Sequence, residues 1–143
     1  MRLVLDTTVL VAAFRSHTGA SRLLFDFVAK RDSTARLVTS SALFLEYEAV
    51  LTRPGQRAAH GFSVEKIEEF LVLLASFTDQ VRIDYRYRPQ LRDANDEMVL
   101  EAAINGRANA IVTHNVRDFL PAASLFGIAI LTPRSMLEQW RTP

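Results

Sequence analysis

The sequence has no cysteine, only two lysines and no apolar run long enough to cross a membrane. Without cysteine the protein has no disulfide, no thiolate metal site and no cysteine nucleophile, a composition that fits a reducing cytoplasm. A membrane-spanning helix needs roughly 20 apolar residues, and the apolar region Leu71–Phe77 is far shorter. Asp6 precedes the apolar segment Thr7–Phe14 and only Arg2 supplies positive charge ahead of it. We therefore expect no signal peptide, no membrane contact and a cytoplasmic location.

The scarcity of lysine leaves arginine to carry the positive charge. Lysine occurs only at Lys30 and Lys66, so fifteen of the seventeen basic residues are arginine, against sixteen acids and a net charge of +1. Arginine binds phosphate through a planar fork of donors, although the base composition of a genome gives the same bias. The charge is thus compatible with a phosphate-rich partner without requiring one.

The chain has the length and composition of one globular α/β domain. Its 143 residues are 49% hydrophobic and 23% charged, which is not typical of a disordered chain. Short apolar runs predict strands at Leu3–Leu5, Leu37–Thr39, Val81–Ile83, Ala110–Thr113 and Ile128–Leu131. Amphipathic patterns predict helices at Val9–Phe14, Ser21–Lys30, Ala42–Arg53, from the N-cap Ser63 through Ala75, at Glu97–Asn105 before Gly106, and at Arg134–Trp140. This alternation predicts a three-layer α/β/α sandwich with a mainly parallel central sheet.

Two acids follow predicted strands. Asp6 comes directly after the first strand, and Asp118 lies in the predicted turn after Ala110–Thr113. Ligands of open α/β sheets gather at the carboxyl ends of the strands. We therefore expect both carboxylates at the ligand-binding edge.

Two further acids fall among apolar residues by helical periodicity. Asp96 lies in the middle of the apolar face of its helix, whereas Glu97 and Glu101 are predicted on the polar face. Glu46 has apolar helical neighbours and is favoured over Glu48. The alternatives are a helix-dipole role for Asp96 and a partly exposed position for Glu46. A carboxylate that faces the core needs a partner, a proton or a cation.

The four acids Asp6, Glu46, Asp96 and Asp118 together predict a site for a hard divalent cation. Like charges in one cleft raise one another's pKa or bind a cation, and oxygen ligands favour Mg²⁺ or Mn²⁺ over zinc. Such ions activate water and stabilise charge during in-line attack on a phosphodiester. The residues therefore indicate cleavage of phosphate esters.

These acids stand in four segments that resemble the motifs of the PIN domain family. The segments are Leu3–Leu10 around Asp6, Leu45–Leu51 around Glu46, Arg92–Glu97 around Asp96, and Thr113–Phe119 around Asp118. With the closing segment Ile130–Pro133, the likeness spans nearly the whole chain, so residues 1–143 are expected to form a single PIN-like domain. Each motif is short, and the four in this order are what makes the likeness specific.

The resemblance implies a metal-dependent endoribonuclease, often the toxin of a toxin–antitoxin pair, with RNA as substrate. It also implies frequent homodimers and an antitoxin that covers the site. In the resulting hypothesis Asp6, Asp96 and Asp118 bind Mg²⁺ or Mn²⁺, and Glu46 orients or deprotonates the attacking water.

Three departures from the family pattern affect the predicted site. Thr8 stands where the family most often has asparagine, Asn115 stands where aspartate is frequent, and Asn95 dilutes an acid-rich stretch. We assign supporting roles to Thr8, Asp93 and Asn115. The departures also keep a second function open, a PIN-fold module that binds RNA or protein without cutting.

Basic residues near the acids are candidates for holding RNA. The segment Tyr85–Arg88 interleaves aromatic and basic residues, and Arg92 follows it; such a pattern stacks bases and binds phosphates, but it also suits an exposed connector. The candidates for RNA contact are Arg15, Arg86, Arg88, Arg92 and Arg117. His17 extends the patch at Arg15, and His114 serves either substrate or structure.

Other functions fit the sequence less well. A haloacid dehalogenase phosphatase needs an aspartate at the position of Thr8, a phosphorelay receiver needs a late lysine, and no glycine-rich nucleotide loop is present. The predicted helices Val9–Phe14 and Ser21–Lys30 carry many large apolar groups, which predicts either a partner surface or helices covered on two sides.

Overall fold

The computed structural model describes residues 1–16, 18–30 and 34–141 as five strands and eight helices. The strands are β1 Arg2–Leu5, β2 Arg36–Thr39, β3 Thr78–Gln80, β4 Ala110–Val112 and β5 Ala129–Leu131. The helices are α1 Thr7–Arg15, α2 Ala20–Ala29, α3 Ser41–Leu51, α4 Pro54–His60, α5 Val64–Ser76, α6 Ala94–Asn105, α7 Val116–Phe126 and α8 Pro133–Arg141. Within these residues no helix combines the length and apolarity needed to span a membrane.

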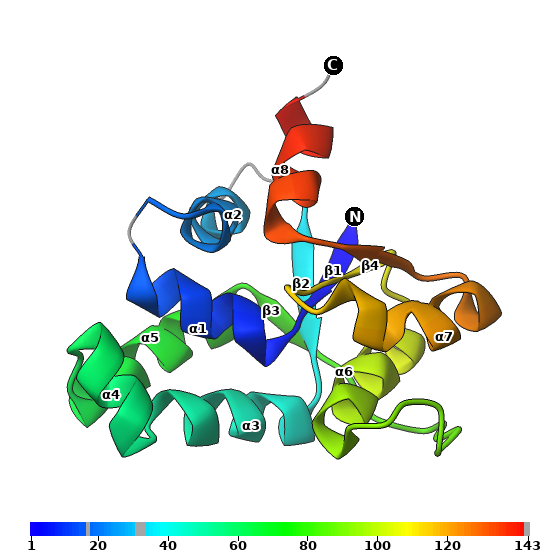
Figure 1. Ribbon diagram of the computed structural model, residues 1–143, viewed down its shortest axis with the longest axis horizontal. Coiled ribbons are helices and arrows are strands. Elements are labelled where there is room, and N and C mark those ends of the chain that lie inside the picture. Colours follow the sequence, from blue (N-terminus) through cyan, green and yellow to red (C-terminus); the bar gives the residue numbers. More distant parts are fainter. Residues whose placement is uncertain (17, 31–33, 142–143) are drawn as a thin grey trace.

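The strands form one parallel sheet in the order β3-β2-β1-β4-β5, flanked by helices, which confirms the predicted fold class. Helix α6 packs across β1, β2 and β4, while α2 packs against α8 and α8 against β5. In Figure 1, α2 and α8 lie on one side of the strands and α6 on the other. Since all strands are parallel, their carboxyl ends share one edge.

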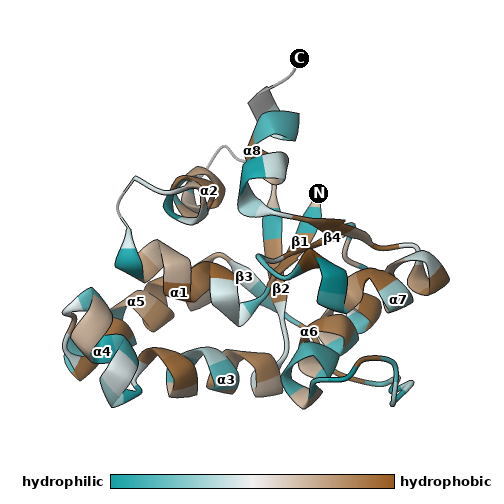
Figure 2. Cartoon of the chain, in the orientation of Figure 1, coloured by the Kyte–Doolittle hydropathy of each residue, from teal (hydrophilic) through white to brown (hydrophobic). Residues whose placement is uncertain are grey.

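The core lies where the central strands meet these helices. Leu3, Val4, Ile111 and Val112 are fully buried, and Figure 2 shows β1 and β4 as hydrophobic while the segment before α6 is largely hydrophilic. Such continuous apolar runs are expected of parallel strands covered on both faces. The strands predicted at β1, β2, β4 and β5 are confirmed. Coverage by helices accounts for the buried apolar residues of β1, β2 and β4, whereas β5 is an edge strand and only partly buried.

The predicted third strand is displaced. The strand is Thr78–Gln80 and not Val81–Ile83, and it pairs in register with Leu37–Thr39. An edge strand covers less of the core, so polar residues serve as well as apolar ones there. Asp79 gains two arginine partners at this position, which the apolar run did not reveal.

Two helices were not predicted. Pro54 was expected only to end α3, but it also stands at the first turn of α4, where its missing N–H costs nothing. The predicted turn around Asp118 is instead the start of α7, which contains Pro121. Phe119 and Ala122 bury one face of α7 and stabilise it despite the proline.

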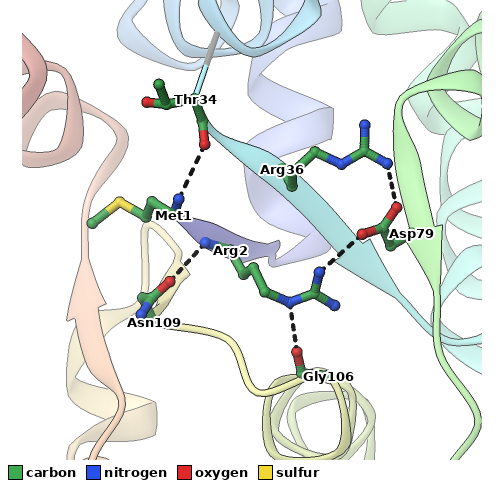
Figure 3. Close-up of polar contacts among 7 residues, drawn as sticks. All are labelled: Met1, Arg2, Thr34, Arg36, Asp79, Gly106 and Asn109. Carbon is green, nitrogen blue, oxygen red and sulfur yellow. Dashed lines mark hydrogen bonds and ion pairs between the residues drawn. The ribbon is translucent and has the colours of Figure 1, made fainter.

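A polar network connects the residues at the amino ends of β1 and β2 with β3 (Figure 3). It lies at the edge of the sheet opposite to Asp6. Arg2 donates through Nε to the carbonyl of Gly106 at 2.8 Å and through a terminal nitrogen to Asp79 at 2.9 Å. Arg36 also pairs with Asp79, and the side chain of Asn109 accepts the backbone N–H of Arg2 at 2.7 Å. Hydrogen bonding from Arg36, followed by that from Arg2, lowers the pKa of Asp79 despite partial desolvation. The network joins β1, β2, β3 and the end of α6.

Candidate functional site

Asp6 is held at the carboxyl edge by two hydroxyl groups. The register of β1 and β4 pairs Leu5 with Val112, so Asp6 and Thr113 follow side by side. Thr113 donates from Oγ1 to Asp6 Oδ2 at 2.7 Å, and Thr8 donates to the same oxygen at 2.8 Å. Asp6 is only 5% exposed. Both bonds go to Oδ2, which leaves Oδ1 available to a ligand in the cavity that Asp6 lines.

Tyr47 connects α3 to this edge. Its buried hydroxyl donates to the carbonyl of Leu5, the residue before Asp6. Burial, reinforced by the negative charge of Asp6, raises the pKa of Tyr47, so the hydroxyl stays a donor. The neighbouring Glu46 is half-buried and lines the same cavity as Asp6. Tyr47 thereby positions the helix that carries Glu46.

Asp96 lies in the first turn of α6, where Asp93 is the N-cap and accepts the N–H of Asn95 at 2.8 Å. Desolvation by burial, followed by the charges of Asp6, Asp93, Asp118 and Glu97 in that order, raises the pKa of Asp96 to about 6. The carboxylates are thus close enough to repel one another.

The predicted acids line two adjoining cavities at the carboxyl edge. Asp6, Glu46 and Asp96 line one, of about 410 Å³. Asp96 and Asp118 line the other, of about 660 Å³. Asp93 and Asp96 belong to both cavities, which therefore form one cleft. Among the described residues, however, no three acidic or histidine side chains stand close enough to bind one ion together.

The supporting residues lie at the same edge. Thr8 bonds Asp6 directly, and its hydroxyl also accepts the N–H of His114 at 3.4 Å. The N–H of Asn115 bonds the hydroxyl of Thr113 at 2.9 Å, and Asn115 lines the smaller cavity. The ring of His114 shares a hydrogen bond of 2.8 Å with the buried Ser21, which gives this histidine a structural contact.

Glu97 and Glu101, which were predicted on the polar face of their helix, do not face solvent. Each is only 5% exposed. Glu97 accepts the N–H groups of Gln90 and Leu91 at 2.7 and 2.8 Å, and Glu101 pairs with Arg88. The segment between β3 and α6 folds over this face of α6 and supplies donors to both acids. Helical periodicity registers only polarity and does not show that another segment covers the polar face.

The five arginines proposed to hold RNA do not all lie in the cleft. Arg92 and Arg117 line the larger cavity, and Arg15 lines the smaller one, where it bonds Gln56 at 2.9 Å. Arg88 is engaged by Glu101, and Arg86 lines a separate cavity beside Ser41 and Gln80. His17 lies outside the described residues. Only three of the five arginines therefore line the cleft.

The apolar groups of α1 and α2 are mostly core. The buried ones are Val9, Leu10, Ala13, Phe14, Leu24, Phe25 and Val28. Phe27 stacks on Trp140 of α8 with ring centroids 4.4 Å apart, and Leu23 is 40% exposed. These helices are covered on two sides, as the second alternative predicted.

Three structural features of the cleft were not predicted from the sequence: the hydrogen bonds of the Thr113 and Tyr47 hydroxyls, and the burial of Glu97 and Glu101 in α6. Thr113 had a detectable signal, because it follows β4 as Asp6 follows β1. Tyr47 had no such signal, because its role depends on how closely α3 approaches β1.

Comparison with known proteins gives a family and a fold. The family model described as PIN domain matches residues 2–117. The structure resembles VapBC-1 from nontypeable Haemophilus influenzae, with a TM-score of 0.59 and 16% identity over 94% of this chain and 99% of that chain. It also resembles VapBC2 from Rickettsia felis bound to a DNA fragment from their promoter, with a TM-score of 0.60 and 17% identity over 92% and 98% of the two chains. No curated protein matches the sequence.

Proposed function

The chain belongs to the PIN domain family, and we propose that it is a metal-dependent endoribonuclease. The observation that supports this most is the cleft in which Asp6, Glu46 and Asp96 line one cavity and Asp118 lines its extension. Four acids from distant parts of the sequence gather at the edge where open α/β sheets bind ligands. Their like charges act on one another, as the raised pKa of Asp96 indicates.

The donor set fits a hard divalent ion. It consists of carboxylate oxygens, with hydroxyl groups bonded behind them, and contains no sulfur. Mg²⁺ keeps several water ligands and is commonly bound through one or two carboxylates, so a cluster of three converging acids is not required. We assign binding of Mg²⁺ or Mn²⁺ to Asp6, Asp96 and Asp118, directly or through water. The bound ion would offset the repulsion among the acids and polarise the phosphodiester.

The side chains of the cleft have distinct roles in this proposal. Thr8 and Thr113 fix the rotamer of Asp6, so its free oxygen keeps one direction. Glu46, half-buried across the smaller cavity, accepts a proton from the attacking water or orients it. Arg15 and Arg117, one in each cavity, bind phosphates on either side of the cut bond.

We further propose that the protein is the toxin of a toxin–antitoxin pair, with an antitoxin as partner and a homodimer as its assembly. The support is the PIN domain itself and the likeness of the fold to two VapBC structures. Purification from cells that also express the neighbouring gene tests the partner, and light scattering of the lone chain tests the dimer.

Cleavage of an RNA panel tests the enzymatic function. Wild type is expected to cut single-stranded RNA with Mn²⁺ and to stop when EDTA is added. Asp6→Asn and Asp96→Asn should each lower the cleavage rate by more than roughly 100-fold. Loss of a residue that only hydrogen-bonds a metal ligand costs roughly 10- to 100-fold, and loss of a metal ligand itself should cost more. Asp26→Asn is the matched control, because Asp26 is an exposed acid on α2 paired with Arg22. Wild-type rates in either site variant would refute the assignment.

A PIN-fold module that binds without cutting is the second candidate. Thr8 and Asn115, which replace the residues more usual in the family, favour it. In that case the RNA panel shows binding that survives EDTA and no cleavage with any divalent ion. The Asp6→Asn variant would then bind RNA better than wild type, because one repelling charge is removed.

A further inference from the structure

The larger cavity of the cleft is lined by apolar residues as well as by acids. Pro89 and Leu91, from the segment before α6, line it together with Pro121 of α7. Its volume of about 660 Å³ lies within the range of roughly 300–1,000 Å³ typical of small-ligand sites. Its acids, Asp93, Asp96 and Asp118, belong to the catalytic proposal, but its apolar residues have no role in it.

Two guanidinium groups line the same cavity. Arg92 precedes the N-cap of α6, and Arg117 lies in the first turn of α7. Within residues 1–16, 18–30 and 34–141, neither side chain forms an ion pair or hydrogen bond with the protein. By contrast, Arg88 of the same segment is bound by Glu101. Arg92 and Arg117 therefore keep their donors for a ligand, and a planar fork of donors suits phosphate.

The apolar wall is held in place by buried groups. Glu97 accepts the N–H groups of Gln90 and Leu91, and the pair of Arg88 with Glu101 fixes the residue before Pro89. Both glutamates are 5% exposed, so the backbone bonds to Glu97 are shielded from water, while the Arg88 side chain that pairs with Glu101 is partly exposed. A wall fixed in this way loses little conformational freedom when a ligand binds.

We propose that the larger cavity is a subsite for one nucleotide of single-stranded RNA, next to the bond that is cut. The proposal rests on the proposed ribonuclease function and deepens it. The base packs between Leu91 and Pro121, and the phosphate binds Arg92 and Arg117. Because Asp96 lines both cavities, the neighbouring phosphodiester then lies over the acids. A cavity of this kind accepts an unpaired base, whereas a base within a duplex cannot enter it.

Binding of a fluorescein-labelled single-stranded RNA decamer in Mg²⁺ tests the subsite. All variants are made in the Asp6→Asn background, which prevents cleavage if the protein is a nuclease. The double change Arg92→Gln with Arg117→Gln should weaken binding by at least roughly tenfold and reduce the salt slope by roughly 0.7 for each lost phosphate contact. Leu91→Ala should weaken binding without changing the slope. The matched control is Arg107→Gln, an exposed arginine in the turn before β4 at the opposite end of the sheet.

The possible outcomes distinguish failure of the proposed subsite from failure of the proposed nuclease function. Cleavage by wild type, combined with unchanged RNA affinity in the double variant, overturns the subsite and leaves the nuclease in place. Arginine-dependent RNA binding without cleavage supports the subsite and removes the nuclease. A duplex of the same sequence should bind more weakly than the single strand and respond less to Leu91→Ala. If Leu91→Ala weakened binding of the duplex and of the single strand equally, the proposed insertion of a base into the cavity would be overturned. Circular dichroism of each variant establishes that it is folded.

Discussion

The hydroxyl of Thr113 donates to the carboxylate of Asp6 at 2.7 Å, across 107 residues of sequence. The bond follows from the register of the central strands, because Leu5 pairs with Val112 and the next residues emerge together. Asp6 is nearly buried and has its second hydroxyl partner in Thr8. The carboxylate is therefore oriented by the sheet itself, before any ligand binds.

Replacing Thr113 by valine tests this orientation. Thr113→Val keeps the shape of the side chain but leaves a buried carboxylate oxygen with one partner fewer, so the free energy of unfolding should fall by about 1–3 kcal/mol. RNA cleavage should fall by roughly 10- to 100-fold, as is usual when an outer partner of a metal ligand is lost.

Thr52→Val is the matched control for this change. The hydroxyl of Thr52 bonds only the carbonyls of Glu48 and Ala49 in its own helix. Its loss should cost less than about 0.5 kcal/mol and leave cleavage unchanged. Equal effects of the two substitutions, measured by urea denaturation and by cleavage rate, would contradict the proposed role of Thr113.

The close packing of Gly106 against the side chain of Val38 gives a second prediction. A Cβ at Gly106 would lie 2.3 Å from Val38 Cγ1 and 2.8 Å from the carbonyl oxygen of Ala102. Gly106→Ala should therefore lower the free energy of unfolding by about 1–3 kcal/mol, as overpacking does. Gly55→Ala in α4 meets nothing within 4 Å and should be neutral or stabilising by up to about 1 kcal/mol. Thermal or urea denaturation measures both, and a neutral Gly106→Ala would contradict the packing.

The network around Asp79 predicts a dependence on pH. Hydrogen bonds from Arg36 and Arg2 lower the pKa of this carboxyl, so its contribution to stability is present above the ordinary pKa of about 3.9. The contribution is lost as pH falls through the lowered pKa. Each of these partly exposed ion pairs contributes at most about 1 kcal/mol. Asp79→Asn should thus be less stable than wild type at about pH 7, and the difference should shrink at about pH 3.

Denaturation of wild type and Asp79→Asn at both pH values measures this difference. Asp84→Asn is the control, since among the described residues Asp84 forms an ion pair only with Arg82, whose side chain is 89% exposed. A difference between wild type and Asp79→Asn that is as large in acid as at neutral pH would show that the charge of Asp79 is not what stabilises the strands.

The strands and helices that can be predicted from the sequence are those whose residue pattern reflects their burial. Residues 3–5 and 110–112 are continuous apolar runs because both faces of these strands are covered, and the run itself reveals the strand. The displaced strand β3 and the unpredicted helix α7 obey other constraints. Asp79 is placed by two arginines from neighbouring strands, and α7 is stabilised through Phe119, which is fully buried. Neither contact is visible in a local pattern.

The acids of the site also differ in whether a local sequence pattern reveals their position. Asp6 could be predicted because it ends a strand, and Asp96 because it interrupts an apolar stripe. Glu97 and Glu101 were misplaced, because their donors come from a segment that has no regular structure of its own. Proximity of four acids could be predicted from topology. Their spacing could not, because it depends on rotamers and on the packing of α3 and α6 against the sheet.

In the proposed nuclease, Asp6 and Asp96 share a divalent ion at the carboxyl edge of the sheet. Crystals soaked in Mn²⁺, with diffraction collected for anomalous scattering, test it most directly. We expect an anomalous peak in the cleft, about 2.1 Å from an oxygen of Asp6 or Asp96, and we expect it to disappear in Asp96→Asn crystals. Anomalous density elsewhere on the molecule, with none between these two carboxylates, would contradict it.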